Sequence, residues 1–207
     1  MPLQLHPTIP LYRRSEAING TSFDRHGLLR LSENRRHLAH ADGTPFFWLG
    51  DTAWPLFTQY SRQEAEIYLE NRAKKGFTII QGVLTWFGGD RPDPSGMSSN
   101  WKGEYPWLNK DPAHPNPAFF EHVDDLLSLA QNLDLTLAIL PTWGNYVTDL
   151  HLFTAESARQ YGTWLGSRYR DRPNIVWING GDCLPQVLRP SLMPWLKGCA
   201  QGMVAGI

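Results

Sequence analysis

A chain of 207 residues can bury one sizeable core, and 42% hydrophobic with 19% charged residues is typical of a globular protein. The formal net charge of −1 excludes the basic footprint of a nucleic-acid-binding protein. Since no apolar run reaches the roughly 18 residues of a membrane span, we expect neither nucleic acid nor membrane as a partner.

The start of the chain is predicted to be an extension of residues 1–27, ahead of one domain over 28–207. The first 20 residues lack the apolar segment of a signal peptide, so the chain as written is expected in the cytoplasm. Residues 29–31 and 37–47 flank turn-forming residues, and Asp42-Gly43 is a strong turn signal. These features predict a small β-hairpin at the start of the domain.

The first strand of the main sheet is predicted at residues 46–51, an apolar run that ends in a carboxylate. Ser61 and Glu64 then have the spacing of a helix capping box. The helix that they open is predicted to run to about Lys75, where Gly76 is suited to end it.

The same strand and helix pattern repeats three more times. Residues 77–84, 133–140 and 174–179 are apolar runs typical of buried strands. Asn116-Pro117 predicts a helix to about residue 132, Thr154 predicts one to about 169, and a weaker pattern marks a fourth at 191–205. Four alternations of strand and helix predict a parallel α/β architecture.

Two parallel architectures fit this alternation. A doubly wound fold requires a glycine-rich phosphate turn after its first strand, and neither that turn nor a P-loop is present in the sequence. The polar and aromatic residues instead gather just after the predicted strands, where a barrel places its active site. We therefore predict a (β/α)8 TIM-barrel fold, of which this chain holds the first four βα units.

Aromatic and polar side chains after the strands are the candidate binding residues. Flat indoles beside polar groups suit a sugar. From composition alone, however, ordinary core packing is the preferred interpretation of tryptophans at strand ends, including Trp101 and Trp107 in the predicted loops. Because barrel loops converge on one face, we expect the candidates to line a single pocket. They are Asp51, Trp54, Gln81, Trp86, Trp143, Asn145 and Asn179.

Asp182 is the candidate catalytic residue. A glycosidase needs two carboxyl groups beside the scissile bond. Asp182 follows the fourth predicted strand and a Gly-Gly pair that lets the backbone turn sharply and leaves the carboxylate unobstructed. For Asp51, a structural hydrogen bond is as good an interpretation. The seven histidines lack the His-x-His and His-x-x-x-His spacings of metal ligands, so we predict no catalytic metal and no cofactor.

Four motifs in order carry a family resemblance: WLGDTAW at 48–54, GFTIIQ at 76–81, LPTWG at 140–144, and NIVW with GGD at 174–177 and 180–182. Together they resemble the apiosidase-like catalytic domain, domain of unknown function 4038, grouped in glycoside hydrolase family 140. The resemblance spans about residues 28–207 and implies a (β/α)8 barrel glycosidase of the retaining type that acts on pectic polysaccharide of the plant cell wall. It implies Asp182 as general acid/base, with Asp51, Trp54, Gln81, Trp143 and Asn145 as sugar contacts.

The sequence departs from this family at the second carboxylate. The family nucleophile is a Glu after a late strand, whereas the last Glu here is Glu156, so the nucleophile is missing from this chain. Residues 46–207 supply four βα units, and eight need about 250 residues. The alternative function is a non-catalytic carbohydrate-binding remnant or a truncated form of such an enzyme. Open barrel edges also predict self-association, and the family is often exported.

Overall fold

The structure is a computed structural model that describes residues 20–86 and 96–179. Its main element is a four-stranded parallel sheet in the order β3-β4-β5-β6. Register pairs Asp51 with Ile80 between the first two strands and Ile80 with Leu137 between the next two. The predicted α/β architecture is confirmed. The strands are β3 (Gly50–Thr52), β4 (Ile79–Val83), β5 (Thr136–Leu140) and β6 (Ile175–Trp177).

Three long helices connect these strands, and their amino-terminal caps are those predicted. Ser61 and Glu64 form a reciprocal capping box at the start of α2 (Arg62–Lys74). The side chain of Asn116 caps α3 (Pro117–Asn132), whose first residue is proline, and Thr154 caps α5 (Ala155–Tyr169). A short helix, α4 (Asn145–Thr148), and a 3-10 turn, η1 (Leu108–Lys110), lie in segments predicted as loops. The predicted helix at 191–205 lies outside the described residues.

Alternate strand residues divide between two faces of the sheet. Ile80, Leu137 and Ile139 are buried in a core cluster with the apolar sides of the helices. Their strand neighbours therefore point to the opposite face, because side-chain direction alternates along a strand. This second face, called the inner face here, carries Gln81 on β4 and Ala138 on β5, which are paired in register. In a barrel the inner face is the one that surrounds the axis.

The first strand differs from its prediction in position and in burial. The apolar run at 46–51 was expected to be a buried strand, but β3 is shorter and begins at Gly50. The side chains before it are exposed: Phe47 is 74% accessible, Trp48 44% and Leu49 39%. The reason is position, since β3 pairs with β4 on one side only and forms an edge of the sheet.

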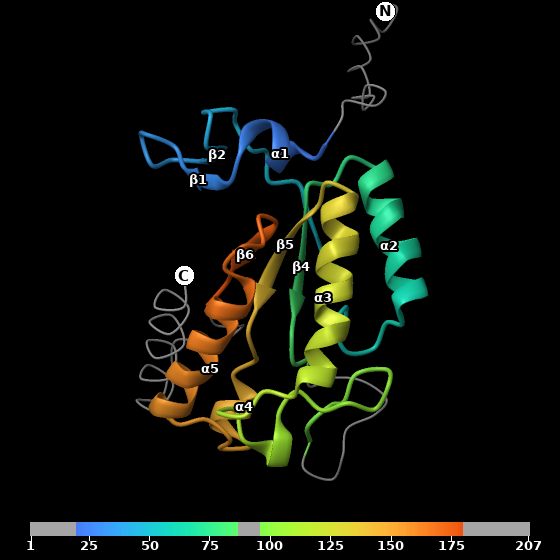
Figure 1. Ribbon diagram of the computed structural model, residues 1–207, viewed down its shortest axis with the longest axis vertical. Coiled ribbons are helices and arrows are strands. Elements are labelled where there is room, and N and C mark those ends of the chain that lie inside the picture. Colours follow the sequence, from blue (N-terminus) through green and yellow to red (C-terminus); the bar gives the residue numbers. More distant parts are fainter. Residues whose placement is uncertain (1–19, 87–95, 180–207) are drawn as a thin grey trace, which may run out of the picture.

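A smaller unit lies at the amino-terminal ends of the strands, opposite to the end where α4 lies (Figure 1). It contains α1 (Ser22–His26) and the antiparallel hairpin of β1 (Leu29–Leu31) and β2 (Leu38–His40), which confirms the predicted hairpin. Helix α1 was not predicted. It packs with the hairpin through Phe23 and His40, so this unit includes part of the segment that we had assigned to an extension.

None of the helices in residues 20–86 and 96–179 combines the length and the apolar character that a membrane crossing requires.

Candidate functional site

Three tryptophans from three different strand ends meet at the carboxyl end of the sheet. Trp54 follows β3, Trp86 follows β4 and Trp143 follows β5, each by two or three residues. The rings of Trp54 and Trp86 are stacked, with centroids 6.0 Å apart and planes 9° apart. The ring of Trp143 meets both of them edge-on, at 5.3 and 5.5 Å. All three are half-buried, and we call this cluster the tryptophan wall.

The backbone holds two members of the wall in place. The carbonyl of Trp54 accepts a hydrogen bond from the amide of Val83 at 3.2 Å, which ties the end of β3 to β4. The carbonyl of Trp143 accepts from the amide of Tyr146 at 3.2 Å, at the start of α4. The wall therefore rests on regular secondary structure, which positions a site more precisely than a free loop would.

Polar candidates lie around this end of the sheet. Gln81 is on the inner face of β4, half-buried. Asn145 opens α4, two residues after Trp143, and its side-chain oxygen is buried with no hydrogen-bond partner in the described part of the chain. Asn179 is exposed, two residues beyond β6. The role of these three residues as sugar contacts stays a prediction.

Asp51 does not join this group. It pairs in register with Ile80, which faces the helices, so its side chain points to the helix side of the sheet. There its carboxylate accepts hydrogen bonds from the guanidinium of Arg72 and, at 3.0 Å, from the hydroxyl of Tyr68. The hydrogen bond from Arg72 is the main reason that the pKa of Asp51 is lowered. Asp51 therefore forms a structural ion pair between β3 and α2, the alternative that the sequence left open, and a sugar contact by this residue stays a prediction.

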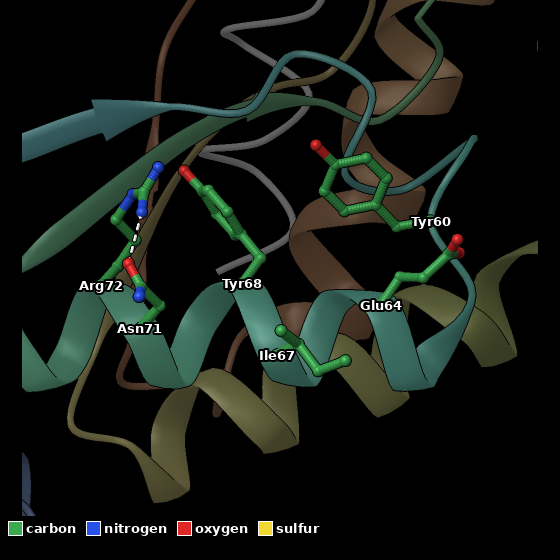
Figure 2. A pocket seen from close by; sticks show the side chains of 6 residues that line it. All are labelled: Tyr60, Glu64, Ile67, Tyr68, Asn71 and Arg72. Carbon is green, nitrogen blue, oxygen red and sulfur yellow. Dashed lines mark hydrogen bonds between the residues drawn. The ribbon is translucent and has the colours of Figure 1, made fainter.

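A shallow pocket beside this ion pair is a separate feature (Figure 2). Tyr60 and five residues of α2 line it, and the side chains of Tyr68 and Arg72 point toward the strand that passes behind them. Arg72 also donates to the side-chain oxygen of Asn71 at 2.6 Å. The pocket lies on the outer side of the sheet, and no member of the tryptophan wall lines it. We therefore do not place the site there.

A buried histidine anchors the long segment between β4 and α3. His122 on α3 is 1% exposed, and its Nε2 lies 3.1 Å from the carbonyl of Tyr60. Its Nδ1 lies 3.4 Å from the indole nitrogen of Trp101. A carbonyl only accepts, so Nε2 carries the proton and Nδ1 accepts from the indole. These two hydrogen bonds require the neutral imidazole, and burial favours the same form because it lowers the pKa of His122.

The other tryptophan of that segment belongs to the core. Trp107 is 1% exposed, and its ring meets those of Tyr146, Phe153 and Tyr161 edge-on at 5.2 to 5.7 Å. Ordinary core packing is therefore the correct interpretation for Trp107, whereas three other tryptophans form the tryptophan wall.

Two threonines next to the wall were not among the predicted site residues. Thr85 and Thr142 are both fully buried, and the hydroxyl of Thr85 donates to that of Thr142 at 2.7 Å. The signal was available, because two strands in succession are followed by the same dipeptide, Thr85-Trp86 and Thr142-Trp143.

Two further observations concern the chemistry of the site, namely its possible metal ligands and the place of Asp182. Residues 20–86 and 96–179 contain no cluster of three or more His, Cys, Asp or Glu side chains that could hold a metal ion. Asp182, the predicted general acid/base, lies outside the described residues. Its position in the sequence is five residues after the end of β6, the fourth strand of the sheet.

Comparison with known proteins decides the family. A family model described as "Apiosidase-like, catalytic domain" matches residues 32–204. The chain belongs to this apiosidase-like family. It is thus a glycoside hydrolase-like domain, and the resemblance that four motifs predicted is confirmed. A comparison with curated proteins finds no match.

Solved structures extend the comparison to the fold of this apiosidase-like domain. One, a "Glycoside hydrolase", is 30% identical with a TM-score of 0.75 over 89% of this chain and 40% of its own. A glycoside hydrolase family 5 protein from Bacteroides vulgatus ATCC 8482 is 26% identical, also with a TM-score of 0.75, over 89% and 38%. An endo-1,4-β-mannanase from Rhizomucor miehei, 16% identical with a TM-score of 0.54 over 85% and 57%, shares the fold. The chain thus spans about 40% of the length of the first of these structures.

Proposed function

We propose that this chain supplies the first four βα units of a glycoside hydrolase barrel that acts on pectic polysaccharide at apiose-linked side chains. The observation that carries the proposal is the tryptophan wall, which stands at the carboxyl ends of parallel strands in an apiosidase-like domain. A sugar ring presents an apolar C–H face with a hydroxylated rim, and an indole in a polar setting matches both parts. Asn145, which begins α4 two residues after Trp143, is the polar contact that we assign next to the wall.

We assign Asp182 the role of general acid/base. In the sequence it follows β6, the strand next to β5, and parallel strands have their carboxyl ends at the same end of a sheet. Retention of configuration needs a second carboxyl group about 5–5.5 Å from the first. No Glu follows Asp182 in the 207 residues, and we propose that the nucleophile comes from βα units outside them.

The first test measures sugar binding by the chain itself. Isothermal titration compares a pectic oligosaccharide that carries apiose side chains with the same backbone without apiose and with mannan and cellulose oligosaccharides. We expect binding of the apiose-bearing ligand and at least about tenfold weaker binding of the others, a difference of about 1.4 kcal/mol. Equal affinity for all of them would refute the pectic assignment.

The second test measures hydrolysis in a complete barrel. Residues 32–204 replace the corresponding part of the 30% identical glycoside hydrolase, and apiose release is assayed with Asp182 and with Asp182→Asn. We expect the substitution to lower kcat by about a thousandfold or more while the ligand still binds, since general acid/base catalysis contributes about 10²–10⁴-fold. Undiminished turnover of the variant would eliminate Asp182, and binding without turnover in the chimaera that keeps Asp182 would favour a binding module.

We also propose that the chain self-associates through the edge of β3. This edge presents exposed Phe47, Trp48 and Leu49, and exposed edge strands with apolar side chains pair readily. Light scattering should detect a dimer, and Trp48→Lys should shift it toward monomer. Ile67→Lys, at a residue 66% exposed on α2, is the matched control and should leave the dimer intact. A monomer at all concentrations of the unmodified chain would contradict self-association.

A further inference from the structure

Two neighbouring strands, β4 and β5, continue into the same dipeptide, and its threonines touch. The last backbone hydrogen bond of this pair runs from the amide of Leu84 to the carbonyl of Leu140 at 3.0 Å. Beyond it, the hydroxyl of Thr85 donates to that of Thr142 at 2.7 Å, with both side chains fully buried. The contact between the strands is thus prolonged by a side-chain bond, one residue before each indole.

The three members of the tryptophan wall differ in how they are anchored. Trp54 is held by the bond between its carbonyl and the amide of Val83, and Trp143 by the bond between its carbonyl and the amide of Tyr146. The segment of Trp143 is fixed a second time, because Tyr161 donates to the carbonyl of Pro141 at 3.2 Å. The segment of Trp86 is tied to the end of β5 by the amide of Leu84 and, one residue before the indole, to the segment after β5 by the hydroxyl of Thr85.

The chemistry of threonine suits such an anchor. A β-branched side chain has few χ1 rotamers, so the position of its hydroxyl follows the position of its backbone closely. In a buried, low-dielectric setting the hydrogen bond is strong, and a hydroxyl left without its partner is unfavourable. A hydrogen bond between two such hydroxyls therefore fixes the separation of the two backbones that carry Trp86 and Trp143.

We propose that Thr85 and Thr142 are positioning residues that set the geometry of the tryptophan wall. The link from this geometry to sugar affinity rests on the function proposed above, whereas the link from the threonine pair to the indoles does not. The edge-on contact of Trp86 with Trp143, at 5.5 Å, is the part of the wall that the pair controls.

The test uses Thr85→Val, Thr142→Val and the double variant of the whole chain. Valine has the shape of threonine without the hydroxyl. Each single variant leaves one buried hydroxyl without its hydrogen-bond partner, whereas the double variant removes both hydroxyls. Stability should therefore fall in the single variants and recover in the double variant. If the pair positions the wall, the near-ultraviolet circular dichroism of the coupled indoles stays altered in all three variants. Affinity for the apiose-bearing oligosaccharide should fall about tenfold, which corresponds to the loss of about one hydrogen bond.

Two controls separate positioning from general stability. Thr136→Val alters another buried threonine of β5, whose hydroxyl has no hydrogen-bond partner in the described part of the chain, and should leave both signals unchanged. Thr142→Ser keeps the hydroxyl, so the indole signal should match that of the unmodified chain and the sugar affinity should stay within about twofold of it. An unchanged indole signal in the double variant would overturn the proposal. If the unmodified chain binds no sugar, the proposed function fails while the circular dichroism still decides the role of the threonines.

Discussion

The two ends of the parallel sheet are built in opposite ways. At the amino-terminal end, α2 is joined to β4 and α3 to β5 by connections of only a few residues. At the carboxyl end, the connections are longer, and the one between β4 and α3 spans residues 84–116. The short connections hold apolar elements together, and the long ones carry the tryptophan wall. Barrels in general divide stability and function between their ends in this way.

Left-handed residues make the short connections possible. Gly76, between α2 and β4, has φ 84°, and Asp134, between α3 and β5, has φ 58°. Asp134 also accepts hydrogen bonds from the amide and the hydroxyl of Ser22, at 2.8 and 2.6 Å. One residue thus reverses the chain and fastens α1 to the sheet. The contrast between the two ends predicts that substitutions at the amino-terminal end of the sheet alter stability, whereas substitutions at the carboxyl end alter sugar binding.

The largest effect on binding is expected for Trp143→Ala, because Trp143 touches both other members of the wall. Burial of an aromatic face contributes about 1.5–3 kcal/mol, so affinity for the apiose-bearing oligosaccharide should fall about ten- to hundredfold. Isothermal titration measures it. Trp48→Ala, at a tryptophan of the amino-terminal end, is the control and should bind normally; a similar loss there would erase the distinction between the ends.

The next largest effect is expected for Asp134→Ala, which removes the acceptor for both bonds from Ser22 and places alanine at a positive φ. The free energy of unfolding should fall by about 2 kcal/mol, measured by urea denaturation. Asp134→Asn keeps an acceptor and tolerates the left-handed backbone, so its loss should stay below about 1 kcal/mol. Sugar affinity should be the same in all three proteins, and a change would contradict the division.

Asp51→Asn should have a smaller effect, since the ion pair with Arg72 is partly exposed. We expect a loss of about 1 kcal/mol at pH 7. The pKa of Asp51 is lowered by Arg72, so the unfolded state takes up a proton first as the pH falls. The contribution is therefore present above about pH 4 and lost below it. Denaturation of both proteins at pH 7 and pH 3 checks this: their stabilities should converge in acid.

The smallest effect is expected from His122. Burial lowers its pKa, so below the ordinary value of about 6.5 the unfolded state binds the proton and the folded state does not. Stability should therefore decline by less than about 1 kcal/mol between pH 7 and pH 6. Lys102 opposes protonation and Asp125 favours it, both as weaker influences. The difference between the unmodified chain and His122→Phe isolates this slope from the other histidines, and parallel curves would contradict it.

Local signals made much of the fold predictable. The caps at Ser61, Asn116 and Thr154 depend on a few neighbouring residues, so the sequence states them directly. The order of strands and helices follows from hydrophobic periodicity. The exposure of β3 could not be predicted in this way, because the burial of a strand depends on whether another strand lies beside it.

The site was predictable to the extent that it follows from parallel topology. Strands that run in one direction bring their trailing residues to one edge, and this placed Trp54, Trp86 and Trp143 together. Parallel topology alone could not show which face of the sheet a residue points to, because the register of its strand was unknown. The side chain of Asp51 pairs with Arg72, 21 residues later, and no pattern in the sequence predicted that partner.

Unequal pairing along the sheet has a consequence for how the wall can move. Three registered residue pairs join β3 to β4, whereas five join β4 to β5. Local opening begins where the fewest interactions must break, so β3 can detach while β4 and β5 stay together. Trp54 would leave with it, and Trp86 and Trp143 would stay behind. Trp54 is therefore expected to move more readily than Trp86 and Trp143, because β3 is joined to β4 by fewer pairs than β4 is to β5.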